Sequence, residues 1–179
     1  MNNKRIWLSS PHMGGNELKY INDAFQKNWI APVGPHLDIF ENKLSAISND
    51  HYVAALSSGT SAIHLALILL GIKQNDEVIC SSFTFSASAN PIVYQGARPI
   101  FVDSEYDTWN MSPEYLDDAI RDRISKGRKP KAIILVHLYG MPAKMNEILM
   151  ISNKYNIPII EDAAEALGSL YHGLPLGTL

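Results

Sequence analysis

Short apolar runs alternate with helical patterns from residue 52 onward, and this alternation limits the possible folds more than any other feature of the sequence. The predicted strands read as buried strands and cover residues 53–56, 77–80, 98–102, 132–136 and 157–160. The predicted helices lie between them and cover residues 62–70, 83–94, 112–126 and 142–155. This order is typical of β-α-β units, in which helices cover both faces of a parallel sheet. We therefore predict the α/β class, specifically an α/β/α sandwich with a mostly parallel sheet.

The chain divides into two parts on the same evidence. Residues 1–50 read as an extended arm followed by two amphipathic helices, the first beginning near Asn16, with a Pro- and Gly-containing loop at 31–35 between them. Residues 51–179 form the main α/β domain. Residues 170–179 read as an extended segment and a loop that add no closing helix or strand, so we expect a truncated domain.

Composition excludes several classes of protein. The 179 residues are 46% hydrophobic and 18% charged with a formal net charge of −3, and the basic run at 121–131 reads as a solvated helix end and loop, so we expect no nucleic-acid partner. The single cysteine, Cys80, rules out an intrachain disulfide and reads as a small core residue rather than a nucleophile. No apolar run approaches the roughly 20 residues of a membrane span. We expect a soluble, cytoplasmic protein.

Two adjacent carboxylates close the last predicted strand. Glu161 and Asp162 follow an apolar run, and ligands of open α/β sheets bind at the carboxyl ends of the strands. A carboxylate desolvated at that edge needs a cationic partner, for example the protonated ring nitrogen of a cofactor. The alternative is that both residues merely cap an Ala-rich helix that follows them, where the helix dipole favours carboxylates.

A Ser- and Gly-rich turn follows the first predicted strand. Gly59 allows a tight turn, and the first amides of the next helix, with the hydroxyls of Thr60 and Ser61, are suited to binding a phosphate. The segment matches neither a Walker loop nor the G-x-G-x-x-G fingerprint. An ordinary Ser/Thr helix cap remains the alternative.

Aromatic side chains follow two further strands at the same edge. Phe83 and Phe85 follow one strand, while His137 and Tyr139 follow another; an aromatic ring here either stacks on a planar ligand or belongs to the core. A phosphate cradle, an aromatic plate and a carboxylate together suit pyridoxal 5′-phosphate (PLP), which has a phosphate, a ring and a pyridinium nitrogen.

These groups lie in motifs that resemble those of one known family. In chain order the motifs are NWIAPVG at 28–34, SGTSA at 58–62, SFTF at 82–85, FVD at 101–103, HLYG at 137–140 and EDAAEALG at 161–168. The chain is similar to the N-terminal part of the nucleotide-sugar aminotransferases, the DegT–StrS family of fold-type I PLP enzymes. With PHMGGNE at 11–17 and Glu165, it most resembles the members of the bacillosamine pathway.

The resemblance implies a function for the full-length enzyme. It would transfer an amino group from glutamate to the 4-keto group of UDP-4-keto-6-deoxy-N-acetylglucosamine, in surface-glycan biosynthesis, as a homodimer. The cofactor-binding residues that the resemblance implies are Gly59, Thr60, Ser61, Phe85, Asp162 and Glu165. Among these, Thr60 and Ser61 would contact the phosphate, Phe85 would stack on the ring, and Asp162 would pair with the ring nitrogen. Glu165 would lie near the 3′-oxygen, where many relatives have Gln or His.

The lysine that forms the Schiff base in this family is absent. The resemblance places it about a dozen residues beyond residue 179, before the small domain, and no lysine of this chain lies in the expected context. We therefore assign no catalytic residue, and we expect this chain alone to be inactive. The competing hypothesis is a non-catalytic binding or dimerisation fragment of the same fold. A hydrolase that uses a serine with His137 and Asp162 lacks the G-x-S-x-G elbow, and a metal site from His64, His137 and Glu161 lacks ligand spacing.

Overall fold

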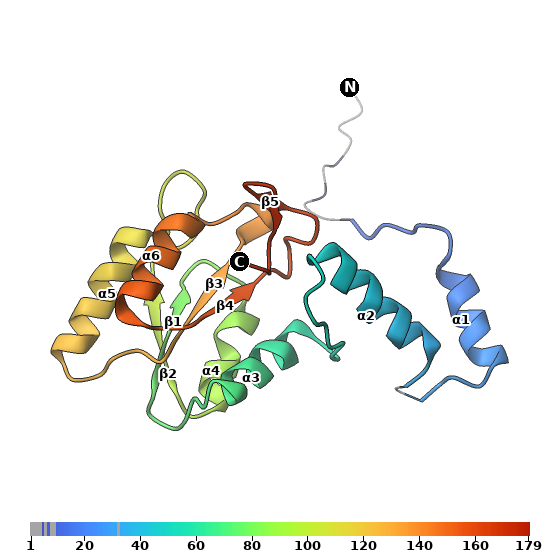
Figure 1. The fold of residues 1–179 in the computed structure, drawn as a ribbon, viewed down its shortest axis with the longest axis horizontal. Helices are drawn as coiled ribbons and strands as arrows, with labels where there is room; N and C mark the ends of the chain where they lie inside the picture. Colours follow the sequence, from blue (N-terminus) through green and yellow to red (C-terminus); the bar gives the residue numbers. More distant parts are fainter. Residues whose placement is uncertain (1–4, 6, 8–9, 32) are drawn as a thin grey trace.

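The computed structural model describes residues 5, 7, 10–31 and 33–179 (Figure 1). Most of the expected N-terminal arm and one residue of the expected loop at 31–35 lie outside the described residues. The described chain contains a parallel sheet with helices on both faces, a pair of N-terminal helices and a small hairpin near residue 179.

Four parallel strands form the sheet. They are β1 (Glu77–Ser81), β2 (Arg98–Val102), β3 (Ala132–Val136) and β4 (Ile159–Asp162), in the order β2-β1-β3-β4. Each neighbouring pair is parallel, with Ile79 opposite Ile100 and Ile133 opposite Ile159. The predicted parallel sheet is therefore confirmed. β4 begins and ends two residues later than predicted, which makes Asp162 its last residue.

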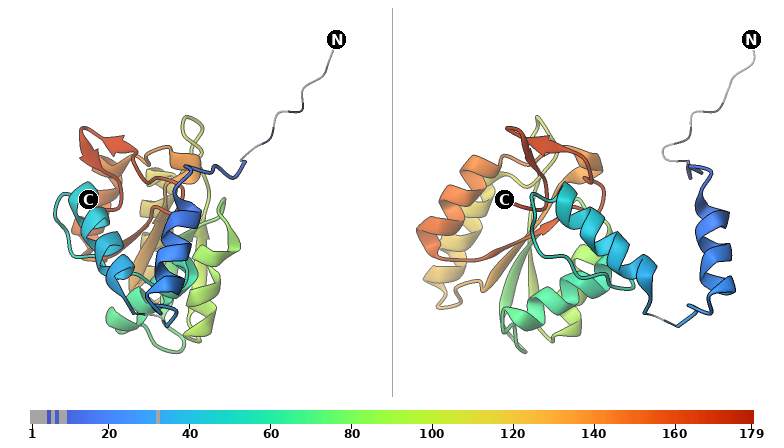
Figure 2. Two further views of the ribbon diagram at one scale, coloured as in Figure 1. Left: turned by 90° about the vertical axis from the view of Figure 1, so that its right-hand side faces the viewer. Right: turned by 45° about the vertical axis from the view of Figure 1, so that its right-hand side comes forward.

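Helices cover the two faces of the sheet, as the predicted sandwich requires (Figures 1 and 2). α3 (Gly59–Leu69) and α4 (Asn90–Tyr94) pack on one face, and α5 (Pro113–Ser125) and α6 (Met145–Tyr155) pack on the other. Each face has its own apolar core because side chains of a strand point alternately to opposite faces.

The central strands show this alternation directly. In β1, Val78 and Cys80 join the core beneath α3 and α4, while Ile79 joins the core beneath α5 and α6. All five residues of β3 are buried, with Ile133 and Ile134 both at 0% exposure. A strand buried on both faces needs a continuous apolar run, which is how the sequence reveals it.

Both expected N-terminal helices are present. α1 (Glu17–Gln26) and α2 (Pro35–Ile47) contain no buried residue, and α1 stands apart from the sheet layers with α2 between them (Figure 2). Their large apolar side chains are exposed, including Leu18, Phe25 and Phe40. None of the helices that the structure describes is long and apolar enough to span a membrane.

The predicted strand at 53–56 is wrong. These residues pair with no strand in the described chain, and the amide of Ala55 instead donates to Glu41 Oε1 at 2.8 Å. Apolar character alone does not make a strand, because the backbone groups need a neighbouring strand as a partner.

Two other predicted segments also need correction. Residues 83–94 are not one helix but an extended entry followed by the 3-10 turn η1 (Ser86–Ser88) and the short helix α4, near whose start Pro91 supplies no backbone donor. Residues 170–179 contain a hairpin of β5 (Leu170–Tyr171) and β6 (Leu174–Pro175). His172 and Gly173, both with positive φ, form its two-residue turn.

A buried ion pair at the amino edge of the sheet generates a stability prediction. Arg123 of α5 donates to both carboxylate oxygens of Glu77, whose side chain is 3% exposed, and this contact raises the pKa of Arg123. Arg123→Ala should lower the free energy of unfolding by about 3 kcal/mol, because it leaves a buried charge without its main partner. Urea unfolding followed by circular dichroism measures the change.

Arg121, on the same helix, provides the control. Its pairs with Asp117 and Asp118 are exposed, so Arg121→Ala should cost less than about 1 kcal/mol. Equal effects of the two substitutions would contradict the importance of the buried pair.

Candidate active site

The order of the strands fixes where a ligand site can form. The chain leaves β1 through α4 toward β2 on one side, and it leaves β3 through α6 toward β4 on the other side. Because β1 and β3 are neighbours, the loops at their carboxyl ends diverge and leave a crevice, as in other open α/β sheets.

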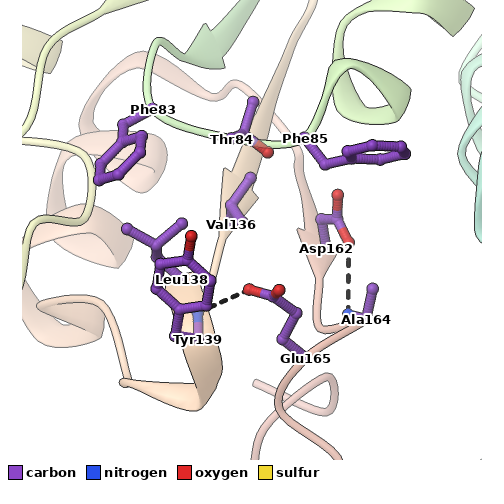
Figure 3. A pocket seen from close by; sticks show the side chains of 9 residues that line it. All are labelled: Phe83, Thr84, Phe85, Val136, Leu138, Tyr139, Asp162, Ala164 and Glu165. Carbon is purple, nitrogen blue, oxygen red and sulfur yellow. Dashed lines mark hydrogen bonds between the residues drawn. The ribbon is translucent and has the colours of Figure 1, made fainter. Parts of the chain in front are cut away.

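A pocket of about 440 Å³ occupies this position (Figure 3). Its walls come from the segments that follow β1, β3 and β4; the lining residues are Phe83, Thr84, Phe85, Val136, Leu138, Tyr139, Ala164, Glu165 and, at the end of β4, Asp162. Three of the six predicted cofactor-binding residues, Phe85, Asp162 and Glu165, therefore share one pocket.

Asp162 presents its carboxylate to the pocket from the end of β4 (Figure 3). Its Oδ2 accepts a hydrogen bond from Ser88 Oγ at 2.6 Å, and its Oδ1 accepts a longer one from the backbone N–H of Ala164 at 3.3 Å. Both donors are neutral. The alternative in which Glu161 and Asp162 cap a helix is wrong, because residues 163–168 form turns and no helix.

Two aromatic rings of the pocket differ in their surroundings. Phe85 is 80% exposed, so it is not the core residue that one alternative predicted. Phe83 is 43% exposed and meets the edge of Trp109, with ring centroids 6.0 Å apart. Phe85 is thus the ring with a free face for a ligand, while Phe83 belongs to an aromatic pair.

Glu165 and Tyr139 are joined across the pocket (Figure 3). The backbone N–H of Tyr139 donates to Glu165 Oε2 at 2.7 Å. Tyr139 lies in the left-handed region with φ of 51°, in the 3-10 turn η2 (Leu138–Gly140). The buried Asn110 holds this turn, since it accepts from the amide of Leu138 and donates to the carbonyl of Met141.

The predicted phosphate cradle lies outside the residues that line the pocket. Gly59 opens α3 and Ser58 caps it, accepting from the amide of Ser61 at 3.1 Å, so the capping interpretation of this turn has a contact to support it. The amides of Gly59 and Thr60 belong to the first turn, where no intrahelical acceptor exists. α3 leads into the amino end of β1 through Ile72, so its first turn points toward the carboxyl edge, as the pocket does.

His137 is buried and acts within the fold. Its Nδ1 accepts from the amide of Ala143 at 3.2 Å, so its Nε2 carries the proton and donates to Glu161 at 3.0 Å. The same Glu161 carboxylate accepts from the amides of Gly177 and Leu179, which holds the last residues of the chain against β4. His137 is thus engaged with Glu161 and is not exposed as a hydrolase base would be.

Sequence reasoning missed the residues that support the site. Ser88 and Asn110 were not predicted, because a serine in a short turn and an asparagine in a loop show no periodic signal. Thr84 was noticed only as part of a motif. No lysine is among the pocket-lining residues in the described part of the chain.

Comparison with known proteins identifies the family. The sequence model of the DegT/DnrJ/EryC1/StrS aminotransferase family matches residues 11–179. The chain belongs to this family.

Two curated relatives illustrate the match. The chain is 53% identical to the putative pyridoxal phosphate-dependent aminotransferase EpsN of Bacillus subtilis, over 98% of this chain and 45% of EpsN. It is 42% identical to the GDP-perosamine synthase of Escherichia coli O157:H7, over 98% of this chain and 46% of that protein. The chain therefore spans less than half the length of these relatives.

Solved structures agree on the fold. A DegT/DnrJ/EryC1/StrS aminotransferase from Brucella abortus superposes with a TM-score of 0.81 at 38% identity, covering 84% of this chain and 40% of that one. The putative sugar aminotransferase Spr1654 of Streptococcus pneumoniae, in its PLP form, gives a TM-score of 0.84 at 30% identity, covering 96% of this chain and 46% of that one. The α/β/α sandwich is thus the fold of this family.

The buried thiol of Cys80 generates a second prediction. Burial raises the pKa of Cys80 to about 12, and the nearby charge of Asp162 adds to the rise. A thiolate is the reactive form, so Cys80 in the folded chain should remain unreactive toward Ellman's reagent at pH 8. The same chain unfolded in guanidinium should release one equivalent of thionitrobenzoate. Complete reaction of the folded chain within minutes would contradict the buried position of Cys80.

Proposed function

We propose that this chain forms the cofactor-binding half of a PLP-dependent aminotransferase that acts on a nucleotide sugar. The observation that carries this proposal is the carboxylate of Asp162, which opens into the pocket and, among the described residues, accepts hydrogen bonds from neutral donors only. A carboxylate in this setting favours a cationic ligand, and a protonated pyridine nitrogen supplies that charge. Membership of an aminotransferase family and the name of EpsN support PLP as the ligand.

The residues of the site fit the parts of PLP. Asp162 would hold the proton on the ring nitrogen, the exposed Phe85 would cover one face of the ring, and Glu165 would lie near the 3′-oxygen. The amides of Gly59 and Thr60 and the hydroxyls of Thr60 and Ser61 would bind the phosphate at the start of α3. When bound, PLP withdraws electrons from the reacting carbon and carries the amino group between substrates.

The proposed substrate is a 4-keto-6-deoxy nucleotide sugar, with glutamate as the amino donor. The named relatives include a GDP-perosamine synthase, and GDP-perosamine is itself a nucleotide-linked amino sugar. UDP-4-keto-6-deoxy-N-acetylglucosamine is our preferred acceptor because of the motif resemblance, which also favours a role in surface-glycan biosynthesis. We place the reaction in the cytoplasm.

We further propose that residues 1–179 alone do not catalyse the reaction. A lysine is needed to move the proton between carbon atoms, and the described lysines do not line the pocket. The alternative, a non-catalytic binding or dimerisation fragment of the same fold, predicts the same inactivity but does not require the pocket to bind PLP.

A homodimer is part of this proposal. Residues 1–50 would form an arm with two helices beside the partial PLP-binding domain of residues 51–179. The apolar side chains of α1 and α2 support association with a second copy, because several of them are about half exposed or more, including Leu18, Phe25 and Phe40.

Binding of pyridoxamine 5′-phosphate (PMP) tests the proposed function without needing a lysine, since PMP has an amine in place of the aldehyde that would react with a lysine side chain. The wild-type chain should bind PMP, measured by calorimetry, and Asp162→Asn should weaken binding about 10- to 100-fold because it removes one charge-assisted hydrogen bond. Asp107→Asn, at an exposed position paired with Lys144, should bind like the wild type.

The outcome also separates the two hypotheses. No binding of PMP to the wild-type chain, or equal binding by Asp162→Asn, would contradict the proposed cofactor site and favour the non-catalytic fragment. The wild-type chain mixed with PLP and glutamate should form 2-oxoglutarate no faster than PLP alone.

A further inference from the structure

Asp162 stands at the end of a chain of hydroxyl groups that no part of the proposed function uses. Thr84 Oγ1 lies 2.7 Å from Ser88 Oγ, and Ser88 Oγ lies 2.6 Å from Asp162 Oδ2. Ser88 belongs to η1 and is 0% exposed, whereas Thr84 lines the pocket. Two hydroxyls from the segment after β1 thus reach the carboxylate at the end of β4.

The chemistry of the three groups fixes the direction of these hydrogen bonds. An ionised carboxylate only accepts, so the hydroxyl proton of Ser88 points to Asp162. Ser88 then has no proton left for Thr84 and accepts the proton of the Thr84 hydroxyl. Each donor polarises the next, which strengthens the bond that reaches Asp162.

The other contacts of the Asp162 carboxylate show why the Ser88 hydroxyl is important. The carboxylate of Asp162 also affects the thiol of the buried Cys80 of β1 electrostatically. The hydrogen-bond partners of the Asp162 carboxylate in the described chain are Ser88 and the amide of Ala164, and the second contact is long, at 3.3 Å. Without Ser88, Oδ2 would lose its only short hydrogen bond in the described chain.

We propose that Ser88, oriented by Thr84, is a positioning residue that holds the Asp162 carboxylate aimed at the ring nitrogen of the bound pyridine cofactor. The inference rests on the proposed function and deepens it. A carboxylate that accepts a strong hydrogen bond competes less for a proton, so the proton shared with the cofactor stays on the ring nitrogen. A protonated ring nitrogen is what makes the cofactor an electron acceptor.

The experiment compares variants by PMP binding and by the protonation state of the ring. PMP labelled with ¹⁵N in the ring is titrated into each chain, and its ¹⁵N chemical shift reports the protonated fraction of that nitrogen. Ser88→Ala should weaken PMP binding about tenfold, because one hydrogen bond to a charged group is lost. Its bound ring signal should move toward that of unprotonated pyridine.

Matched variants separate the hydroxyl from its surroundings. Thr84→Val should shift the signal in the same direction by a smaller amount, and Thr84→Ser, which retains the hydroxyl, should restore the wild-type signal. Ser86→Ala, on the same turn but exposed and without a side-chain hydrogen bond to Asp162, should match the wild type. A merely structural role for Ser88 would lower stability without changing the ring signal.

The possible failures are distinguishable. If wild-type chain binds no PMP, the proposed function is contradicted and this inference with it. If the wild type binds PMP and Asp162→Asn loses binding, but Ser88→Ala keeps the wild-type affinity and ring signal, the role of Ser88 alone is contradicted. If Ser88→Ala does not fold, Thr84→Val and Thr84→Ser are compared by the same ¹⁵N ring signal. Equal signals from these two variants would then contradict the role of Ser88.

Discussion

The structure of the site depends on one negative charge that the protein surrounds with neutral donors. Asp162 ends a parallel strand, faces a pocket, and receives hydrogen bonds from a buried serine and a backbone amide. Keeping a carboxylate ionised away from bulk water costs free energy unless hydrogen bonds or a cation compensate. The hydroxyl chain supplies part of that compensation, and the proposed cofactor would supply the rest.

The sheet creates the conditions for this charge. Because the strands are parallel, the segments after β1, β3 and β4 all leave from one edge, and the opposite connections of β1 and β3 open a crevice there. Each segment contributes a different chemical group to the pocket: an aromatic ring at Phe85, a backbone turn at Tyr139, and carboxylates at Asp162 and Glu165. The family shares this architecture, which explains how one fold can bring these groups together.

The sequence predicts the sheet well because buried parallel strands require continuous apolar runs, as in residues 132–136. It places Asp162 at a carboxyl edge for the same reason. It fails at residues 53–56, since an apolar run does not reveal whether a pairing strand exists. It also cannot reveal Ser88, because that contact joins residues distant in the sequence. The turn at His172 and Gly173 did carry a usable signal in the sequence, a glycine in a two-residue gap between short apolar pairs, because glycine readily adopts the positive φ that such a turn requires.

A crystal structure of the 179-residue chain grown with PMP tests the central claim most directly. The account predicts the ring nitrogen within hydrogen-bond distance of the Asp162 carboxylate, Phe85 against the ring, and the phosphate at the first turn of α3 near Thr60 and Ser61. A PMP molecule bound elsewhere, or one whose phosphate rather than its ring nitrogen faces Asp162, would contradict it.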